Sequence, residues 1–266
     1  MSAIHWLLPL LAGVPIGLTI GLIGGGGSIL AVPLLVYVVG VASPHVAVAT
    51  AAIAVALNAA AGVANHARIG NIKWPCALVF AAAGVTGAAL GAQAGKAVDG
   101  ERLLAAFGAL MIVVGALLLR SRQTPPQPDV RLSRDTASHL LPRLIPIGFG
   151  VGLVAGFFGI GGGFLIVPGL MIATAMPMST AIGTSLVIVT ALGVATAGSY
   201  AWSGFVDWPM SMLLVLGGAV GSTIGMRLGR RIAQRRRLLE IGFACVVMTV
   251  GAFVLIEATL LNATAR

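Results

Sequence analysis

The sequence predicts an all-α, polytopic integral membrane protein made of two homologous repeats, and three observations predict it. The chain is 58% hydrophobic and 9% charged, with a mean hydropathy of +1.04. Apolar runs of about 18 residues or more, long enough for a helix to span a bilayer, recur along the chain. Two glycine-rich stretches, one in each half, are near copies of each other. A water-soluble core is disfavoured, because no polar face could cover so much apolar surface.

The repeat is visible as two pairs of aligned segments. Residues 17–33 read GLTIGLIGGGGSILAVP, and residues 152–168, at an offset of 135, read GLVAGFFGIGGGFLIVP. At an offset of 134, GNIKWP at 70–75 corresponds to GFVDWP at 204–209. Glycine-broken hydrophobic segments at matching places in two halves are typical of the substrate site of a transporter.

We therefore divide the chain into repeat 1 (1–120), a linker (121–142) and repeat 2 (143–266). Each repeat is expected to hold about three full spanning helices plus a glycine-broken front hairpin, which gives 8–10 helical segments in all. The Pro-rich, charged linker is expected to be a flexible cytoplasmic tether. No basic segment precedes the first apolar run, so we expect no cleavable signal peptide. The predicted spans lie near 5–23, 46–66, 74–95, 103–119, 144–160, 181–201, 208–226 and 238–258, with shorter apolar pieces near 28–40 and 163–175.

The net charge of +9 is distributed as in a membrane protein rather than a nucleic-acid-binding one. Most positive charges lie around 68–73, 120–143 and 227–237, which is the pattern that the positive-inside rule produces. These segments are expected to face the cytoplasm, while the loops at 96–102 and 203–208 face outward. No nucleic acid partner is expected.

Equivalent loops of the two repeats thus carry opposite charge bias. The loop with Arg68 and Lys73 corresponds to 203–208, which contains Asp207 and no positive charge. This bias favours repeats that are inverted relative to each other, with an odd number of crossings in each repeat and both termini outside. The alternative is a parallel repeat with four crossings in each half, which places equivalent loops on the same side.

The glycine blocks are the predicted substrate-binding backbone. Each glycine in a helix interior costs about 1 kcal/mol relative to Ala, so nearly consecutive glycines predict a helix break. The N–H groups freed by the breaks, near Ser28–Leu30 and Gly163–Leu165, would bind an anion at a helix start. The alternative is close helix packing. The predicted residues are Gly24, Gly25, Gly26, Gly27 and Ser28 in repeat 1, and Gly159, Gly161, Gly162 and Gly163 in repeat 2.

Glycines spaced by four are interpreted differently. Gly87, Gly91 and Gly95 in repeat 1, and Gly221, Gly225 and Gly229 in repeat 2, each line one helix face. That spacing is typical of close packing between membrane helices, and these residues are expected to be structural.

A few polar residues complete the predicted site. Thr50 and Thr184 correspond at an offset of 134, Ser185 follows Thr184, and their hydroxyls are candidates to donate to an anion. The alternative is that each hydroxyl bonds a carbonyl of its own helix. Asn58 is the most interior strongly polar residue of its helix and corresponds to Leu192, so it is a candidate asymmetric site residue.

Other chemistry is not indicated. The spans hold almost no ionisable residue, so substrate would be held mainly by backbone dipoles and hydroxyls, which suits a weakly bound small oxyanion. The two cysteines, Cys76 and Cys245, make no metal motif and are expected to be reduced and packed. No catalytic residue, metal ligand or cofactor is predicted, and enzyme motifs such as HExxH and GxSxG are absent from the sequence.

These residues also resemble a known family. The paired glycine blocks, the Thr-containing helix after each block and the GxxxWP loops, over roughly 10–258, are similar to the TauE/SafE family of sulfite exporters. The resemblance implies a bacterial or archaeal inner-membrane transporter that moves sulfite, sulfoacetate or a related organosulfur anion, usually outward. The expected mechanism is alternating access, with one repeat rocking against the other around a site at the membrane midplane.

Three alternatives remain open at this stage. An importer or a channel for another small anion would have the same architecture, since sequence does not give the direction of transport. A membrane enzyme or a non-transporting assembly factor is less favoured. Apart from the bilayer and a small anionic substrate, the remaining candidate partner is a second copy of the chain, because the glycine faces could also serve a dimer interface.

Overall fold

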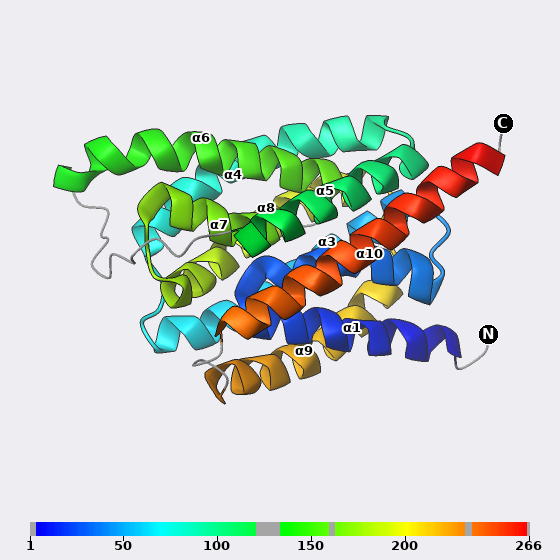
Figure 1. The fold of residues 1–266 in the computed structure, drawn as a ribbon, viewed down its shortest axis with the longest axis horizontal. Coiled ribbons are helices and arrows are strands. Elements are labelled where there is room, and N and C mark those ends of the chain that lie inside the picture. Colours follow the sequence, from blue (N-terminus) through cyan, green and yellow to red (C-terminus); the bar gives the residue numbers. More distant parts are fainter. Residues whose placement is uncertain (1–3, 121–133, 160–162, 232–235, 265–266) are drawn as a thin grey trace.

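The computed structural model describes the chain except for residues 1–3, 121–133, 160–162, 232–235 and 265–266. Every regular element of the described residues is helical, and eight of these helices are long and apolar enough to cross a membrane (Figure 1). Two shorter apolar helices, Ser28–Val39 and Gly163–Thr174, follow the glycine blocks. The prediction of an all-α, polytopic membrane protein is confirmed.

The elements follow the predicted order closely. In the first half they are α1 (Ile4–Ile23), the 3₁₀ helix η1 (Gly24–Leu30), α2 (Ala31–Pro33), the π helix η2 (Leu34–Val39), α3 (Pro44–Arg68), α4 (Trp74–Ala97) and α5 (Gly100–Arg120). In the second half they are α6 (Arg134–Phe158), α7 (Gly163–Thr174), α8 (Met178–Trp202), α9 (Trp208–Arg231) and α10 (Arg236–Thr264).

One boundary differs from the prediction. We expected a flexible linker over 121–142, but α6 already begins at Arg134, inside that range. Three of the four prolines in the predicted linker, Pro125, Pro126 and Pro128, precede Arg134, and the fourth, Pro142, lies inside α6. Residues 121–133 lie outside the described part of the chain, and for them the tether stays a prediction.

The long helices run between two ends of the molecule (Figure 1). One end, here called the terminus end, carries both chain termini, the α4–α5 junction and the α8–α9 loop. The opposite end, here called the linker end, carries the α3–α4 loop, the end of α5 and the start of α6. Contacts agree with this layout, because a Cβ added at Gly100 would lie 3.0 Å from Pro44 Cγ, and one at Gly183 would meet the Asn71 carbonyl.

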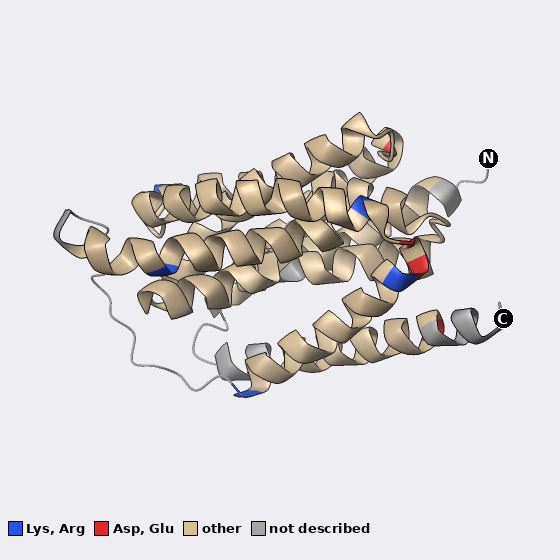
Figure 2. Cartoon of the chain, turned by 90° about the horizontal axis from the view of Figure 1, so that it is seen from above, with Lys and Arg blue, Asp and Glu red and all other residues tan. Residues whose placement is uncertain are grey.

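Acidic positions lie near the terminus end, where Lys96 and Arg102 of the α4–α5 junction also lie, whereas the coloured positions near the linker end are Lys or Arg (Figure 2). The described acidic side chains near the terminus end belong to the α4–α5 junction, the α8–α9 loop and the last part of α10: Asp99, Glu101, Asp207 and Glu257. The linker end carries Arg68 and Lys73 on either side of the α3–α4 loop, and Arg120 at the end of α5. The helices therefore bring together the loops that the charge pattern had grouped.

Helix pairs in the bundle exchange between the halves. α1 packs along α9, and α4 packs along α6, whereas α3 crosses α8 and α5 pairs with α10. In the alignment of the two repeats, α1 corresponds to α6 and α9 corresponds to α4. The α1–α9 and α4–α6 pairs are therefore equivalent. Figure 1 shows α1 and α6 running in opposite directions. An inverted repeat requires these two helices to run in opposite directions, and the inverted repeat itself stays a prediction.

Five of the six glycines in the predicted ladders make close helix contacts, whereas a Cβ at Gly229 would lie 3.7 Å from the Leu22 carbonyl oxygen, an ordinary contact. Cβ atoms added at Gly87, Gly91 and Gly95 of α4 would overlap carbonyl oxygens of Phe149, Leu153 and Phe157 on α6. On the equivalent interface, Cβ atoms at Gly221 and Gly225 of α9 would overlap carbonyl oxygens of Val14 and Leu18 on α1. Only glycine permits backbones to approach this closely, so both pairs pack backbone against backbone.

Candidate functional site

Both predicted helix breaks are present. α1 ends at Ile23 and is followed by Gly24 with φ +77°, and α6 ends at Phe158 and is followed by Gly159 with φ +64°. These two glycines correspond at an offset of 135. Because the left-handed region is strained for residues with a Cβ, glycine is needed at both points to end the helix.

The two breaks meet inside the bundle. A Cβ added at Gly25 would lie 2.6 Å from the Cα of Gly163, and one at Gly163 would overlap the carbonyl oxygen of Gly25. The same added Cβ at Gly25 would lie 2.5 Å from Val189, which is near the middle of α8. The glycine blocks of the two halves are therefore in backbone contact at about half the depth of the helices.

Helices α3 and α8 support the breaks in an equivalent way. A Cβ at Gly24 would lie 2.9 Å from Ile182 Cγ2 of α8, and one at Gly159 would overlap Val48 of α3. Val48 and Ile182 correspond at an offset of 134. The hydroxyl of Ser185 also faces this point, since its oxygen would be 3.3 Å from a Cβ at Gly24.

Ser28 also lies near the contact between the two breaks, but its backbone N–H is not free as we expected. Its fully buried hydroxyl donates to the carbonyl of Gly25 at 3.0 Å. We expected free N–H groups at Ser28–Leu30, and this was wrong, because η1 begins at Gly24 and its i→i+3 bonds occupy the later N–H groups. Free donors of repeat 1 would come from the first residues of η1 instead.

The remaining glycines divide in two. Gly26 and Gly27 lie within η1, and Gly163, the first residue of α7, lies against the backbone of Gly25. Gly161 and Gly162 lie outside the described residues. We call the residues that the structure brings together here the glycine junction: Gly24, Gly25, Ser28, Gly163 and Ser185.

Thr50 and Thr184 take part in a matched pair of hydrogen bonds. The backbone N–H of Asp207 donates to Thr50 Oγ1 at 3.3 Å, and the backbone N–H of Lys73 donates to Thr184 Oγ1 at 3.1 Å. Both threonines are fully buried. Thr50 corresponds to Thr184 and Lys73 to Asp207, each at an offset of 134, so the two bonds are equivalent and each one joins the two halves.

These two bonds lie at opposite ends of the molecule. The Thr50 bond ties α3 to the α8–α9 loop at the terminus end, and the Thr184 bond ties α8 to the α3–α4 loop at the linker end (Figure 1). The threonine hydroxyls were predicted to reach the glycine breaks. The structure shows both hydroxyls accepting a loop N–H, and their contact with a substrate stays a prediction.

Asn58 lies near the middle of α3, against α9. Its Nδ2 donates to the Ala54 carbonyl at 2.9 Å, and a Cβ at Gly218 would overlap this amide. Its buried Oδ1 has no hydrogen-bond partner among the described residues. The equivalent residue, Leu192, lies in the same way against Gly84 of α4. The two contacts are equivalent in position, but Asn58 places a buried polar side chain where the other half has Leu192.

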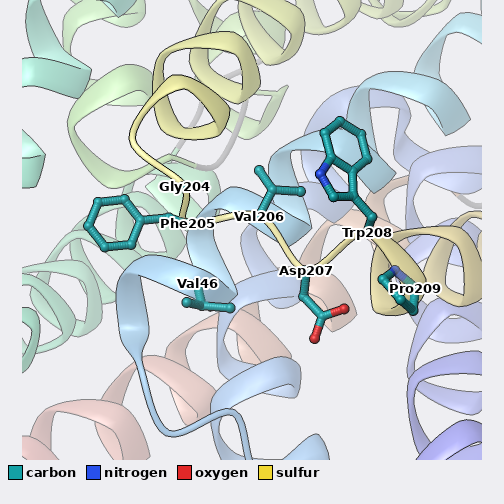
Figure 3. Close-up of a pocket in the computed structure, with 7 residues that line it drawn as sticks. All are labelled: Val46, Gly204, Phe205, Val206, Asp207, Trp208 and Pro209. Atoms are coloured by element: carbon teal, nitrogen blue, oxygen red, sulfur yellow. The ribbon is translucent and has the colours of Figure 1, made fainter.

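A pocket of about 340 Å³ opens at the terminus end (Figure 3). Figure 3 shows the side chains of Val206 and Trp208 on one side of the α8–α9 loop and that of Asp207 on the other. Asp207 Oδ1 accepts the N–H of Met210 and so caps the start of α9. The pocket is lined by Val46, Gly204, Phe205, Val206, Asp207, Trp208 and Pro209. The pocket therefore lies beside the Thr50 bond, not at the glycine junction.

Sequence reasoning missed the loop backbone as the partner of the threonines. A signal was present, because the threonines and the GxxxWP loops share the same offset of 134. The described residues hold no group of three or more His, Cys, Asp or Glu that could bind a metal ion.

Comparison with known proteins gives a consistent result. Residues 9–254 match the family described as sulfite exporter TauE/SafE. A probable membrane transporter protein of Xylella fastidiosa strain 9a5c is 43% identical over 240 residues, which cover 90% of this chain and 91% of that protein. The probable membrane transporter protein YunE of Bacillus subtilis strain 168 is 26% identical over 258 residues, covering 88% and 94% respectively. No solved structure matches.

Proposed function

The chain belongs to the TauE/SafE family of sulfite exporters and is a multi-pass membrane transporter of the bacterial inner membrane, and from this premise we propose that it exports a small sulfur-containing oxyanion. The proposed substrate class is sulfite, sulfoacetate or a related organosulfonate. The observation that carries the proposal is the glycine junction, where the broken helices of both halves meet at mid-depth.

The junction offers the chemistry that an oxyanion needs. Helix α7 starts there, so its first N–H groups and the positive end of its dipole point to the region where Gly25 and Gly163 meet. Ser28 and Ser185 add two hydroxyls. The described Asp and Glu side chains belong to loops and helix ends, so backbone dipoles and hydroxyls would hold the anion, which favours weak and reversible binding.

The bundle also limits how alternating access can occur. We expected one repeat to rock against the other, but α1 packs backbone to backbone on α9, and α4 packs likewise on α6. Rocking whole repeats would break these closest contacts. The moving bodies are better described as the α1–α9 and α4–α6 pairs, each of which contains one helix from each half.

The Thr50 and Thr184 bonds fit the two gates of such a transporter. Each bond ties a central helix to the loop that begins the partner helix of a pair, and the two lie at opposite ends. With both bonds formed, the structure corresponds to a closed state. We assign the linker end to the cytoplasm, because it gathers the Arg- and Lys-rich helix ends.

Flux of labelled sulfite in proteoliposomes tests the proposal. Saturable flux that sulfoacetate inhibits would support the organosulfur class, and counterflow would mark a carrier rather than a channel. A Gly163→Val variant should lose flux, because its side chain would overlap the Gly25 carbonyl. Since this overlap also strains the packing, flux is compared per amount of folded protein. The matched control is Gly198→Ala on α8, where an added Cβ meets nothing within 4 Å.

The outcomes separate the parts of the proposal. Flux of another anion with the same dependence on Gly163 would keep the site and discard the substrate. Normal sulfite flux in Gly163→Val would show that the glycine junction is not the site. An absence of flux and of counterflow for sulfite, sulfate, sulfoacetate and taurine would reject the anion transport proposal.

A further inference from the structure

Two buried hydroxyls near the end of α8 have no role in the site described above. Thr196 and Tyr200 are both fully buried, and neither Thr196 Oγ1 nor Tyr200 Oη has a hydrogen-bond partner among the described residues. Five helical threonines donate to a carbonyl three or four residues earlier: Thr19, Thr86, Thr174, Thr190 and Thr223. Thr50 and Thr184 accept a loop N–H instead. Thr196 departs from both patterns.

Their positions place the two hydroxyls on one face. Residues four apart share a helix face, and a long helical side chain leans towards the helix N-terminus, so the Tyr200 ring extends over the turn of Thr196. Buried polar groups in a membrane protein are normally satisfied within the protein, by water or by a ligand. Two unpaired buried hydroxyls on neighbouring turns of one helix face therefore indicate a ligand group or water between the helices.

A positive charge lies against the same turns of α8. Lys96 Nζ, near the end of α4, donates to the Ser199 carbonyl at 3.3 Å, to Ser199 Oγ at 3.0 Å and to Ser203 Oγ at 3.2 Å. It also lies 5.8 Å from the centre of the Tyr200 ring. We call these five residues the α8 polar cluster: Lys96, Thr196, Ser199, Tyr200 and Ser203.

The cluster is next to the pocket at the terminus end. The ring of Phe205 packs against Tyr200, with ring centres 6.2 Å apart, and Phe205 also lines the 340 Å³ pocket (Figure 3). Phe205 thus contacts both the pocket and the ring of Tyr200.

We propose that the α8 polar cluster is a second oxyanion site, at the terminus end of the transport path. The hydroxyls of Thr196 and Tyr200 donate to the oxyanion, and Lys96 supplies the compensating charge. Tyr200 is eleven residues beyond Val189, so the site lies about 16 Å along α8 from the glycine junction. The identification of a free sulfur oxyanion rests on the proposed function. A phospholipid phosphate presents the same chemistry.

Binding to the intact protein in phosphatidylcholine nanodiscs tests the inference. Sulfite is titrated calorimetrically into the Gly163→Val protein, in which the junction is blocked. Lys96→Met should then weaken the remaining binding about tenfold or more, and Tyr200→Phe and Thr196→Val each about fivefold. The control is Thr190→Val on the same helix, whose hydroxyl is already bonded to the Leu186 carbonyl, and it should leave the affinity unchanged.

Stability without ligand gives a second measurement. Tyr200→Phe removes only an unpaired hydroxyl, so it should not lower the Tm of the ligand-free protein, and this shows that the variant is folded. Lost sulfite affinity at an unchanged or raised Tm supports the site. A fall in Tm equal to that of a packing defect, together with unchanged affinity, overturns it.

The outcomes also distinguish the ligand sources from the proposed function. In one outcome, Gly163→Val abolishes sulfite binding, and the α8 variants made in the parent protein leave it intact. This result overturns the second site while the proposed function stands. In another outcome, phosphatidylglycerol stabilises the protein, Lys96→Met and Tyr200→Phe remove this stabilisation, and sulfite does not bind. This result supports an oxyanion site for a lipid headgroup while the substrate proposal fails. Insensitivity to both ligands shows that water alone satisfies the cluster and overturns the inference.

Discussion

Replacing one of the two cross-repeat threonines should open only one end of the protein. Thr50→Val removes the acceptor of the Asp207 N–H at the terminus end, and Thr184→Val removes the acceptor of the Lys73 N–H at the linker end. Valine has nearly the same shape as threonine, so packing is retained. The two variants are repeat equivalents, and each serves as the matched control for the other.

The expected magnitude follows from the loss of one hydrogen bond. A net contribution of about 1 kcal/mol corresponds to about a fivefold change in an equilibrium constant, and a fully buried unsatisfied donor would approach about 3 kcal/mol. Both bonds are only partly buried on the loop side, so the smaller value applies. We expect the open population at the affected end to rise about fivefold.

Cysteine labelling measures this opening. In a protein with Cys76 and Cys245 replaced by Ala, the reporters are Val206→Cys at the terminus end and Ile72→Cys at the linker end, which are equivalent positions. In nanodiscs, where a maleimide reaches both faces, Thr50→Val should raise labelling of the first reporter and Thr184→Val that of the second.

The reasoning depends on the selectivity of the effect. Equal increases at both reporters in both variants would indicate general loosening of the bundle, not two gates. Unchanged labelling in both variants would show that the bonds do not restrain the loops. Either result would refute the gating role of Thr50 and Thr184.

Three further predictions concern other parts of the structure. Gly91→Val should lower Tm and reduce the amount of folded protein, because α4 can no longer contact the Leu153 carbonyl. The control Gly242→Ala, whose added Cβ meets nothing within 4 Å, should leave Tm unchanged. Equal Tm values for the two variants would show that the helix interface is not tight. Asn58→Leu, which restores the side chain found at its repeat equivalent, should raise Tm by removing an unpaired buried oxygen while reducing sulfite flux, and unchanged flux would exclude Asn58 from the transport path. Cutting the chain within 121–133 and co-expressing both parts should retain flux in proteoliposomes, since the helix pairs that join the halves lie outside that segment, and lost flux despite correct pairing would contradict the tether prediction.

Much of the fold could be predicted because it depends on local composition. Apolar run length set the spans, and the helix breaks followed from the intrinsic cost of glycine, so Gly24 and Gly159 were located from sequence. The glycine ladders also predicted tight interfaces. Their partners could not be predicted, because a glycine face specifies a close approach but not which helix makes it.

The functional residues were less predictable for a related reason. The hydroxyls of Thr50 and Thr184 were expected at the glycine breaks, and their actual partners are loop N–H groups that any residue type could supply. The start of η1 at Gly24, which occupies the N–H groups of Ser28–Leu30, depends on tertiary contacts with α7 and α8. Lys96 and Tyr200 were missed because their significance lies in the hydrogen bonds that Lys96 makes and that the buried Tyr200 hydroxyl lacks, and both depend on tertiary packing.

The exchange of helix partners between the halves has a consequence for how the protein is made. Helix α4 meets its partner α6 soon after leaving the ribosome, but α1 must wait in the bilayer until α9, the last helix but one, is synthesised. Until then, the glycines of α1 that face α9 in the finished protein, Gly13, Gly17 and Gly21, leave backbone exposed to lipid. A membrane quality-control protease or an insertion chaperone would encounter this exposed backbone. Two interfaces that are equivalent in space are therefore completed far apart in time.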